Sequence, residues 1–260
     1  MKTRTLYKII TSALLLMVLA CLISMVTLLI NGPKTDILNG SNLPTSPEER
    51  SPAELTETHD YGDYYVDSMV FVGDKTISAM KTAGVLKDGD ATKQIWSGKD
   101  GDLPLDFNVS SAHIVFPYTE SEISIPDAAK EIKPQYMIIT LGINNGIRCS
   151  EEKFKEYYGK LIEAVREVSP DTRIILQSIF PISKSYEKNN SGVTSEKIDK
   201  ANLWTLELAE SYGARYLNTA SILKDQKGYL KQEYDSGNGI ILNNDGYNAV
   251  LNYIRTHGYK

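Results

Sequence analysis

Apolar positions along the chain follow two alternating patterns. Short continuous apolar runs, rich in β-branched and aromatic residues, predict buried strands. They occupy residues 69–72, 93–96, 136–141, 173–179 and 214–217. Between the runs lie stretches with helical spacing, of which the clearest is 151–168, with Ser150 placed as its N-cap and Pro170 after its end. Two more helices are expected at about 195–212 and 245–257. Buried strands that alternate with helices predict a three-layer α/β/α domain around a mostly parallel sheet.

The N-terminal apolar run differs from the others in length. Residues 9–30 read IITSALLLMVLACLISMVTLLI, 22 positions without a charge, enough to cross a hydrocarbon core of about 30 Å as a helix. The apolar part of a cleaved signal peptide is shorter, at roughly 7 to 15 residues. A lipoprotein-type cleavage at Cys21 is disfavoured, because a further apolar segment follows it. The sequence therefore predicts a single transmembrane anchor.

Charges around this run predict its orientation. Lys2, Arg4 and Lys8 precede the run, whereas only Lys34 follows it closely. Positive residues are retained on the cytoplasmic side of a membrane. We expect a cytoplasmic tail at 1–8, a cell-membrane anchor at 9–30 and an extracytoplasmic remainder.

The segment after the apolar run has the composition of a linker. Residues 31–60 hold four prolines among Ser, Thr, Asn and Glu, with few apolar residues, which is typical of a flexible spacer. The folded domain is expected at 61–260, about 200 residues, long enough to bury roughly 70% of the unfolded chain's surface.

Composition narrows the possible partners. The formal net charge is −5 and no basic run is interleaved with aromatic residues, which argues against a nucleic-acid partner. The cysteines, Cys21 and Cys149, are far apart, and no Cys or His spacing is typical of zinc. We expect no disulfide, metal or cofactor.

Polar blocks follow the predicted strands. Residues 72–76 read VGDKT, residues 141–145 read LGINN, and Gly98 follows the second strand. A fourth block, NGIILNNDGY, covers 238–247 before the last predicted helix. Ligands of parallel sheets bind at the carboxyl ends of the strands, so these blocks are the candidate functional residues.

In this order the four blocks resemble the SGNH/GDSL hydrolases, a family of flavodoxin-like ester hydrolases. Its members have GDS after the first strand, a lone glycine after the second, GxND after the third, and DxxH before the last helix. The resemblance extends from about Tyr64 to the end of the chain, and it is similar to that of wall- or membrane-associated bacterial members. It implies that Gly98 and Asn144 correspond to oxyanion-hole donors and that Asp74 belongs to the same site.

The departures from the family pattern occur at the catalytic positions. Lys75 stands in the place of the nucleophilic serine, and Asn238 and Ile241 stand in the places of the DxxH aspartate and histidine. Asn145 also replaces the aspartate of GxND. The resemblance therefore implies an ester-hydrolase scaffold without its catalytic triad.

The histidines support this interpretation. A serine nucleophile needs a histidine base oriented by an acid group. The chain has only His59, His113 and His257, and the motifs place none of them at the mouth of the sheet. We expect structural or solvated roles for them.

Lys75 leaves one catalytic alternative open. A lysine desolvated in a pocket can lose its charge and act as base or nucleophile, whereas the neighbouring Asp74 favours the charged ammonium. A positive group that fills the former nucleophile pocket or holds an anionic ligand is the favoured interpretation.

Three functions follow from these patterns. The first is a pseudoenzyme that binds a cell-envelope glycan, an acylated ligand or a partner protein. The second is an active esterase or deacetylase on cell-envelope carbohydrate, with a non-standard site around Lys75. The third is a structural or assembly protein whose old pocket is filled, and a pocket lined by Ile241 and Trp96 would favour it.

Overall fold

A five-stranded parallel sheet forms the centre of the part of the chain that the computed structural model describes, residues 50–259. The strands are β1 (Met69–Gly73), β2 (Ile95–Trp96), β5 (Tyr136–Thr140), β6 (Arg173–Gln177) and β7 (Arg215–Leu217). Their order is β2-β1-β5-β6-β7, and every pairing is parallel. This is the flavodoxin-like order. All five predicted strands are confirmed.

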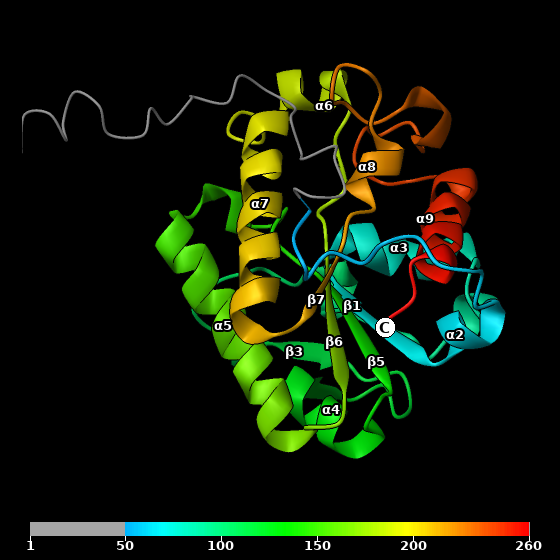
Figure 1. The fold of residues 1–260 in the computed structure, drawn as a ribbon, viewed down its shortest axis with the longest axis vertical. Helices are drawn as coiled ribbons and strands as arrows, with labels where there is room; N and C mark the ends of the chain where they lie inside the picture. The colour runs from blue at the N-terminus through cyan, green and yellow to red at the C-terminus, as the bar shows by residue number, and fades with distance from the viewer. Residues whose placement is uncertain (1–49, 260) are drawn as a thin grey trace, which may run out of the picture. The chain divides into compact units, whose positions relative to one another are not determined.

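Helices cover both faces of the sheet (Figure 1). One face carries α4 (Ile125–Ile132), α5 (Glu151–Val168) and α7 (Ser195–Tyr212). The other carries α2 (Asp63–Asp67), α3 (Lys75–Ala83), α8 (Ala220–Leu223) and α9 (Asn244–Thr256). Side chains alternate between the faces of a strand. Val70 and Val72 of β1 accordingly pack on the α5 side, and Met69 and Phe71 pack on the α9 side. The predicted three-layer α/β/α architecture is confirmed.

The long helices begin and end where their capping residues predict. The side chain of Ser150 accepts a hydrogen bond from Lys153 N at the start of α5, and that of Thr194 accepts one from Lys197 N at the start of α7. Gly213, with φ of 57°, ends α7 in the left-handed conformation that favours glycine. Helix α9 begins one residue before its predicted start, with Asp245 in its first turn.

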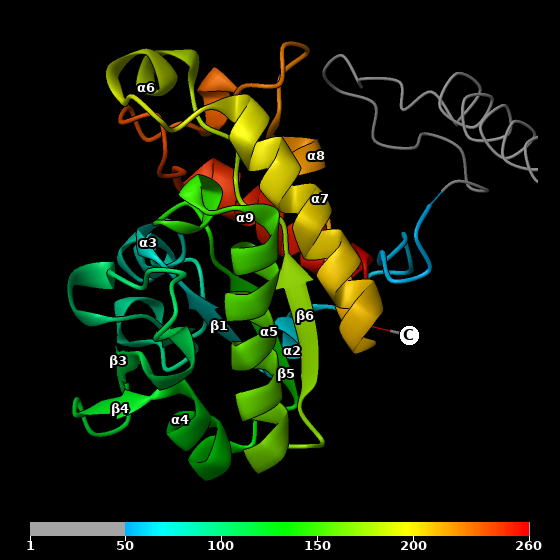
Figure 2. The same ribbon diagram turned by 90° about the vertical axis from the view of Figure 1, so that its left-hand side faces the viewer.

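Smaller elements fill the connections (Figure 2). An antiparallel hairpin of β3 (His113–Val115) and β4 (Glu122–Ser124) lies between β2 and α4, and α6 (Lys184–Asn189) follows β6. Short 3-10 turns occur at η1 (Gly89–Ala91), η2 (Lys99–Gly101), η3 (Val109–Ser111), η4 (Gly146–Arg148) and η5 (Gln232–Tyr234). None of these had been predicted, because each is too short to show a periodic pattern.

The folded domain begins earlier than predicted. Residues 50–60, expected to belong to the flexible spacer 31–60, are packed on the sheet. Leu55 N donates to Tyr216 O at 2.8 Å, and Tyr216 N donates to Ala53 O at 2.9 Å. Ala53 and Leu55 are buried. The predicted boundary at 61 is therefore wrong, because backbone pairing with β7 and two buried apolar side chains hold this segment.

No helix within residues 50–259 is long and apolar enough to cross a membrane. The predicted cytoplasmic tail at 1–8, the anchor at 9–30 and the first part of the spacer lie outside the described residues.

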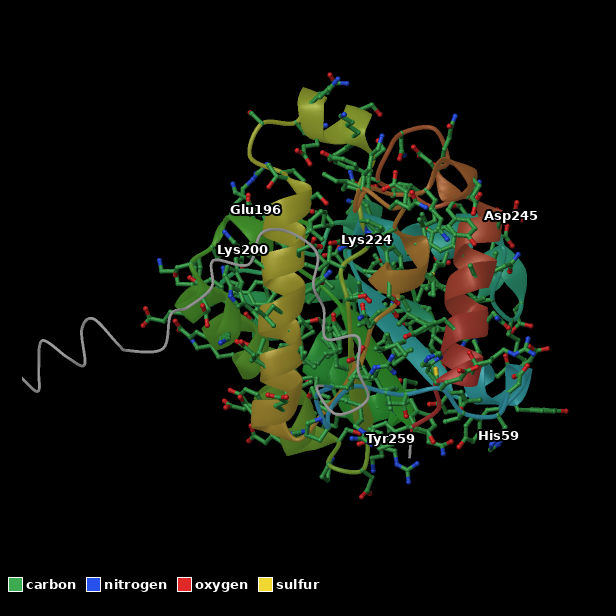
Figure 3. The ribbon with its side chains drawn as sticks, turned by 45° about the horizontal axis from the view of Figure 1, so that its top comes forward. His59, Glu196, Lys200, Lys224, Asp245 and Tyr259 are labelled. Atoms are coloured by element: carbon green, nitrogen blue, oxygen red, sulfur yellow. The ribbon has the colours of Figure 1, made fainter. Side chains whose placement is uncertain are left out.

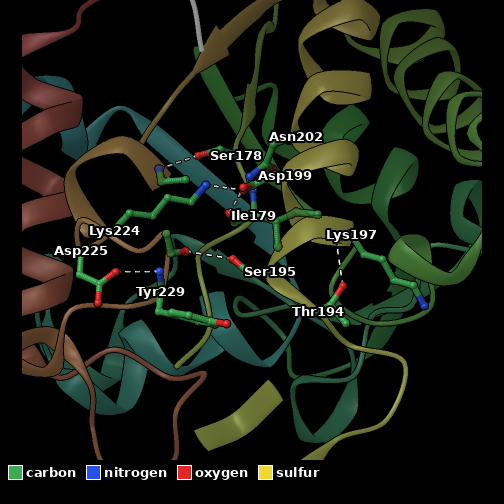
Figure 4. Close-up of polar contacts among 12 residues, drawn as sticks. Ser178, Ile179, Thr194, Ser195, Lys197, Asp199, Asn202, Lys224, Asp225 and Tyr229 are labelled. Atoms are coloured by element: carbon green, nitrogen blue, oxygen red, sulfur yellow. Dashed lines mark hydrogen bonds and ion pairs between the residues drawn. The ribbon is translucent and has the colours of Figure 1, made fainter. Parts of the chain in front are cut away.

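A polar network joins α7 to the end of β6 and to the loop after α8 (Figure 4). Asn202 accepts from Ile179 N at 2.7 Å and donates to Ile179 O at 3.1 Å. Lys224 forms an ion pair with Asp199 of α7. Ser195 Oγ donates to Gly228 O at 3.0 Å. These contacts fix the start of the segment that leads to the 238–247 block.

Candidate functional site

The turn from β1 to α3 is built around Asp74. Its carboxylate accepts from Thr76 N at 3.0 Å and from Thr76 Oγ1 at 2.9 Å, and so caps the amino end of α3. The residue is 2% exposed. Lys75 is the first residue of the helix and is exposed. Asp74 is thus a buried structural cap, and Lys75 is presented at the carboxyl edge of the sheet.

Burial raises the pKa of Asp74 to about 6. The hydrogen bonds from Thr76 and the nearby backbone N–H of Asn144 lower it, while the negative charge of Asp102 raises it further. Desolvation disfavours the ionised carboxylate and outweighs the donors around it.

A tight loop after β2 covers this turn. Gly101 N donates to Gly98 O at 2.9 Å. A Cβ added at Gly98 would lie 1.8 Å from Asp102 O, and one added at Gly101 would lie 3.2 Å from Lys75 Cγ. The 98–102 loop therefore folds back on itself and packs against Lys75, and only glycine fits at its first position.

Asn144 lies after β5 and contacts the same loop. Its amide Nδ2 donates to Asp102 Oδ1. Its backbone carbonyl accepts from Gly146 N at 2.9 Å and from Leu105 N at 3.1 Å. Asn144 is held on both sides, with its side chain directed at the 98–102 loop.

The segment that resembles DxxH forms its own turn. Asn238 Oδ1 accepts from Ile240 N at 3.0 Å and from Ile241 N at 2.8 Å. Gly239 O accepts from Ser183 N at 2.8 Å, just before α6. The oxygen of Asn238 is thus used within its own loop, which rests against the chain after β6.

Ile241 contributes to the apolar packing. It packs against the apolar cluster on the α9 side, which includes Ile77 and Tyr247. The Tyr247 hydroxyl donates to Thr76 O at 2.7 Å, which ties α9 to the start of α3. Trp96 belongs to the cluster on the opposite face. Ile241 and Trp96 thus pack on opposite faces of the sheet.

The three histidines occupy separate places. The ring of His59 lies tilted against that of Tyr61, with 4.2 Å between the ring centroids, at the end of the domain that carries Tyr259 (Figure 3). His257 stacks on Tyr253 at 3.6 Å, and burial lowers its pKa. His113 is exposed on β3, with its backbone carbonyl 3.4 Å from the Cβ position of Gly98.

The structure brings three of the expected site positions together. Lys75 and Asn144 both contact the loop that begins at Gly98. The 238–241 turn contacts Ser183 after β6, and Ile241 packs against the apolar cluster that includes Ile77 of α3. No hydrogen bond or ion pair within residues 50–259 joins Lys75 to Asn238, as the contacts of Asn238 show.

Asp102 is a site residue that the sequence did not identify. It contacts Asn144, 42 residues away in the chain. The one available signal was its place four residues after the lone Gly98, in the run GKDGD. Within residues 50–259, no cluster of His, Cys, Asp or Glu side chains could hold a metal ion.

More than half of the sequence matches a known protein family. Residues 106–249 match the model of the GDSL-like Lipase/Acylhydrolase family. The matched range is more than half of the chain and contains Asn144 and the 238–247 block. The chain belongs to this family. Lys75 and Gly98 precede the matched range.

Several solved structures are similar to this chain, and the first of them supports the fold. A Streptococcus pneumonia protein described as a platelet activating factor is 20% identical, with a TM-score of 0.51, over 72% of this chain and 81% of that one. The periplasmic domain of a lipopolysaccharide acetyltransferase from Salmonella ser. Paratyphi A is 17% identical, with a TM-score of 0.48, over 72% and 82%. A G-D-S-L family lipolytic protein from Desulfitobacterium hafniense DCB-2 is 16% identical, with a TM-score of 0.47, over 72% and 97%. No curated protein matches the sequence.

Proposed function

We propose that this GDSL-family domain is catalytically inactive and that its former active site binds a cell-envelope glycan, an acylated ligand or a partner. The observation that carries this proposal is the use of the three triad-like positions. Lys75 begins α3, Asn238 caps its own turn, and the half-buried Ile241 packs against the apolar cluster on the α9 side. None of these arrangements provides a nucleophile, an acid and a base in contact.

The chemistry of the replacements supports inactivity. A neutral amide and a branched alkane cannot relay a proton, and a hydroxyl nucleophile is weak at neutral pH without an adjacent base. Loss of the nucleophile or base of a triad lowers turnover by about 10⁶, whereas the remaining donors and binding groups leave roughly 10³ to 10⁴ over water. Asn144 and Gly98 could therefore support no more than that residual rate.

Retained polar groups support binding as the function. Lys75 is exposed at the carboxyl edge of the sheet, where ligands of this fold class bind. Asn144 lies beside it through the 98–102 loop. An ammonium and an amide on a rigid sheet edge can orient a ligand without any bond cleavage.

We also propose that the domain lies outside the cytoplasm, on a membrane anchor at residues 9–30. The support is the uncharged apolar run and the positive residues before it. A cell-envelope ligand is the class that such a location makes available.

One observation favours a second candidate, hydrolysis through Lys75. Lys75 occupies the first position of α3, where the family has its nucleophile, and it packs against Gly101. The buried Asp74 beside it argues the other way, because the ionised carboxylate would stabilise the ammonium.

Ester hydrolysis by the full-length chain tests the two candidates. We expect p-nitrophenyl acetate and an O-acetylated polysaccharide to be hydrolysed no faster than by heat-denatured protein, with a histidine-containing family member as positive control. Lys75→Ser alone should also stay at background. The triple change Lys75→Ser, Asn238→Asp and Ile241→His should raise turnover, because triad members act as a unit.

One experimental outcome would refute catalytic inactivity. Robust hydrolysis by the unmodified chain, abolished by Lys75→Ala with the fold intact, would refute the inactive assignment and make Lys75 catalytic. His113→Ala serves as the matched variant, since His113 is the exposed histidine beside Gly98. Activity that survives Lys75→Ala but not His113→Ala would assign the base to the histidine and would equally refute it.

A further inference from the structure

Asp102 contacts two of the positions that could bind an incoming oxygen. Its carboxylate accepts the hydrogen bond that Asn144 Nδ2 donates. Its backbone carbonyl packs against Gly98, where an added Cβ would lie 1.8 Å from it. The Asp102 carboxylate therefore occupies the side-chain donor of Asn144, and its backbone fixes the loop at Gly98.

The loop that carries Asp102 is fixed at several points. Gly101 N donates to Gly98 O at 2.9 Å, and Asp102 N donates to Lys99 O at 3.0 Å. Gly101 has a φ of 75° and leaves no room for a side chain, because Ser78 Oγ would lie 2.4 Å from its Cβ. The loop is thus pressed against the first turn of α3, and Asp102 is placed on Asn144 by the backbone.

We propose that the Asp102 carboxylate is an internal ligand of this site, which keeps carbonyl and anionic oxygens away from the Asn144 amide. The inference rests on the proposed function and adds the class of ligand that Asp102 excludes from the site. It also names the side chain whose removal opens the site.

The chemistry of the two competing groups is similar. A carboxylate is an acceptor of the same type as an acetate ion or a developing oxyanion, and bonds between an amide donor and a charged acceptor are among the stronger hydrogen bonds. A tethered carboxylate acts at a high effective concentration, so a free anion must displace it. The negative charge of Asp102 also opposes a second anion nearby.

The positive charge of Lys75 would favour an anion at the site once the Asp102 carboxylate is removed. Its side chain lies against Gly101 of the same loop, and it begins α3, whose amino end carries partial positive charge. With Asp102 removed, the ammonium and the Asn144 amide would face a small oxyanion together.

Acetate binding to the full-length chain tests the proposal. The variants are Asp102→Ala, which removes the acceptor, and Asp102→Asn, which removes only the charge. Asp100→Asn is the matched control, because it removes the same charge from the same loop, and asparagine tolerates the positive φ of 58° at that position. The side-chain amide resonance of Asn144 in ¹⁵N–¹H spectra reports both the contact and the added acetate.

We expect the Asn144 amide resonance to move in Asp102→Ala and to stay in Asp100→Asn. We expect acetate to bind Asp102→Ala about fivefold to tenfold more tightly than wild type or Asp100→Asn, which is the fold-change that loss of one charge-assisted hydrogen bond gives. Asn144→Ala in the Asp102→Ala background should remove the acetate response.

Equal acetate affinity in Asp102→Ala, Asp102→Asn and Asp100→Asn would overturn the proposal. An Asn144 side-chain amide resonance with the same chemical shift in wild type and Asp102→Ala would also overturn it. Either result leaves the inactive assignment standing. Failure of that assignment would instead appear as ester turnover by the wild-type chain, so the two failures are distinguishable.

Discussion

Asp74 has a structural role as a helix cap, although its place in the VGDKT block predicted it at the candidate site. It follows Gly73, the last residue of β1, yet the residue is only 2% exposed and its carboxylate caps α3. Burial raises its pKa to about 6, from an ordinary value of 3.8. The folded state therefore binds a proton here more tightly than the unfolded state does.

This pKa difference gives a pH dependence of stability with a definite sign. Since the folded pKa is the higher one, the ionised carboxylate destabilises the fold, and wild type should lose stability relative to Asp74→Asn as pH rises through the window from about 4 to about 6. The full change is on the order of 2 to 3 kcal/mol, since one pKa unit corresponds to about 1.4 kcal/mol. Asparagine caps helices as well as aspartate does.

Urea unfolding of both proteins at several pH values between 4 and 8 measures the difference. Carboxylates elsewhere titrate in both proteins and cancel in the comparison. A difference in the free energy of unfolding that does not vary with pH would show that Asp74 titrates normally in the folded protein.

At the scale of elements, the 98–102 loop positions the candidate site. It connects β2 to the hairpin β3–β4, and Val115 N of that hairpin donates to Ser97 O at 2.9 Å. Gly98 has an ordinary φ of −66°, so its requirement for glycine is steric and not conformational.

Gly98→Ala should therefore disrupt the loop. The added methyl group would clash with Asp102 O, and we expect a loss of about 1 to 3 kcal/mol in unfolding free energy, as for overpacked sites, together with loss of the Asn144 to Asp102 contact. Gly84→Ala is the matched control. Gly84 has φ of 65° and open space around its Cβ position, so alanine there should cost about 1 to 2 kcal/mol through the left-handed backbone alone and keep the contact.

Chemical denaturation and the Asn144 side-chain resonance measure the two effects. If Gly98→Ala kept the wild-type resonance and matched Gly84→Ala in stability, the close approach of Asp102 to Gly98 would be incorrect.

The elements differ in how well the sequence predicts them. Helices α5 and α7 have regular apolar spacing and a capping residue at the start, and both were predicted with the correct ends. The hairpin β3–β4 and the 98–102 loop depend on contacts between residues distant in sequence, such as Asn144 with Asp102. Local patterns carry no information on such pairs.

The error at the start of the domain has the same cause. Residues 50–60 have the composition of a spacer, yet contacts with distant residues hold them, such as the pairing of Leu55 and Ala53 with Tyr216, about 160 residues later. Conversely, the strands were predicted with ends within two residues of the observed ones, because buried parallel strands are continuous apolar runs. Lys75 and Asn144 were found by their place directly after such runs.

At the scale of the whole domain, the described chain begins at the end opposite the candidate site. Pro52 O accepts from Arg215 Nη1 at 2.6 Å, at the amino end of β7, and Thr58 N donates to Thr256 O near the carboxyl end of the chain. Lys75 and Asn144 lie at the carboxyl ends of β1 and β5.

The proposed anchor predicts both membrane attachment and orientation. Expressed in a bacterial host, the full-length chain should remain in the membrane pellet after alkaline carbonate extraction, whereas a chain that starts at residue 31 should be released, because it lacks the uncharged apolar run 9–30. In cells whose wall has been opened, added protease should remove the domain while a cytoplasmic marker stays intact. Changing Lys2, Arg4 and Lys8 to asparagine removes the positive charges that favour a cytoplasmic N-terminus, so a protected fraction should appear. Complete protection of the unmodified chain would place the domain in the cytoplasm and contradict both the anchor orientation and a cell-envelope ligand.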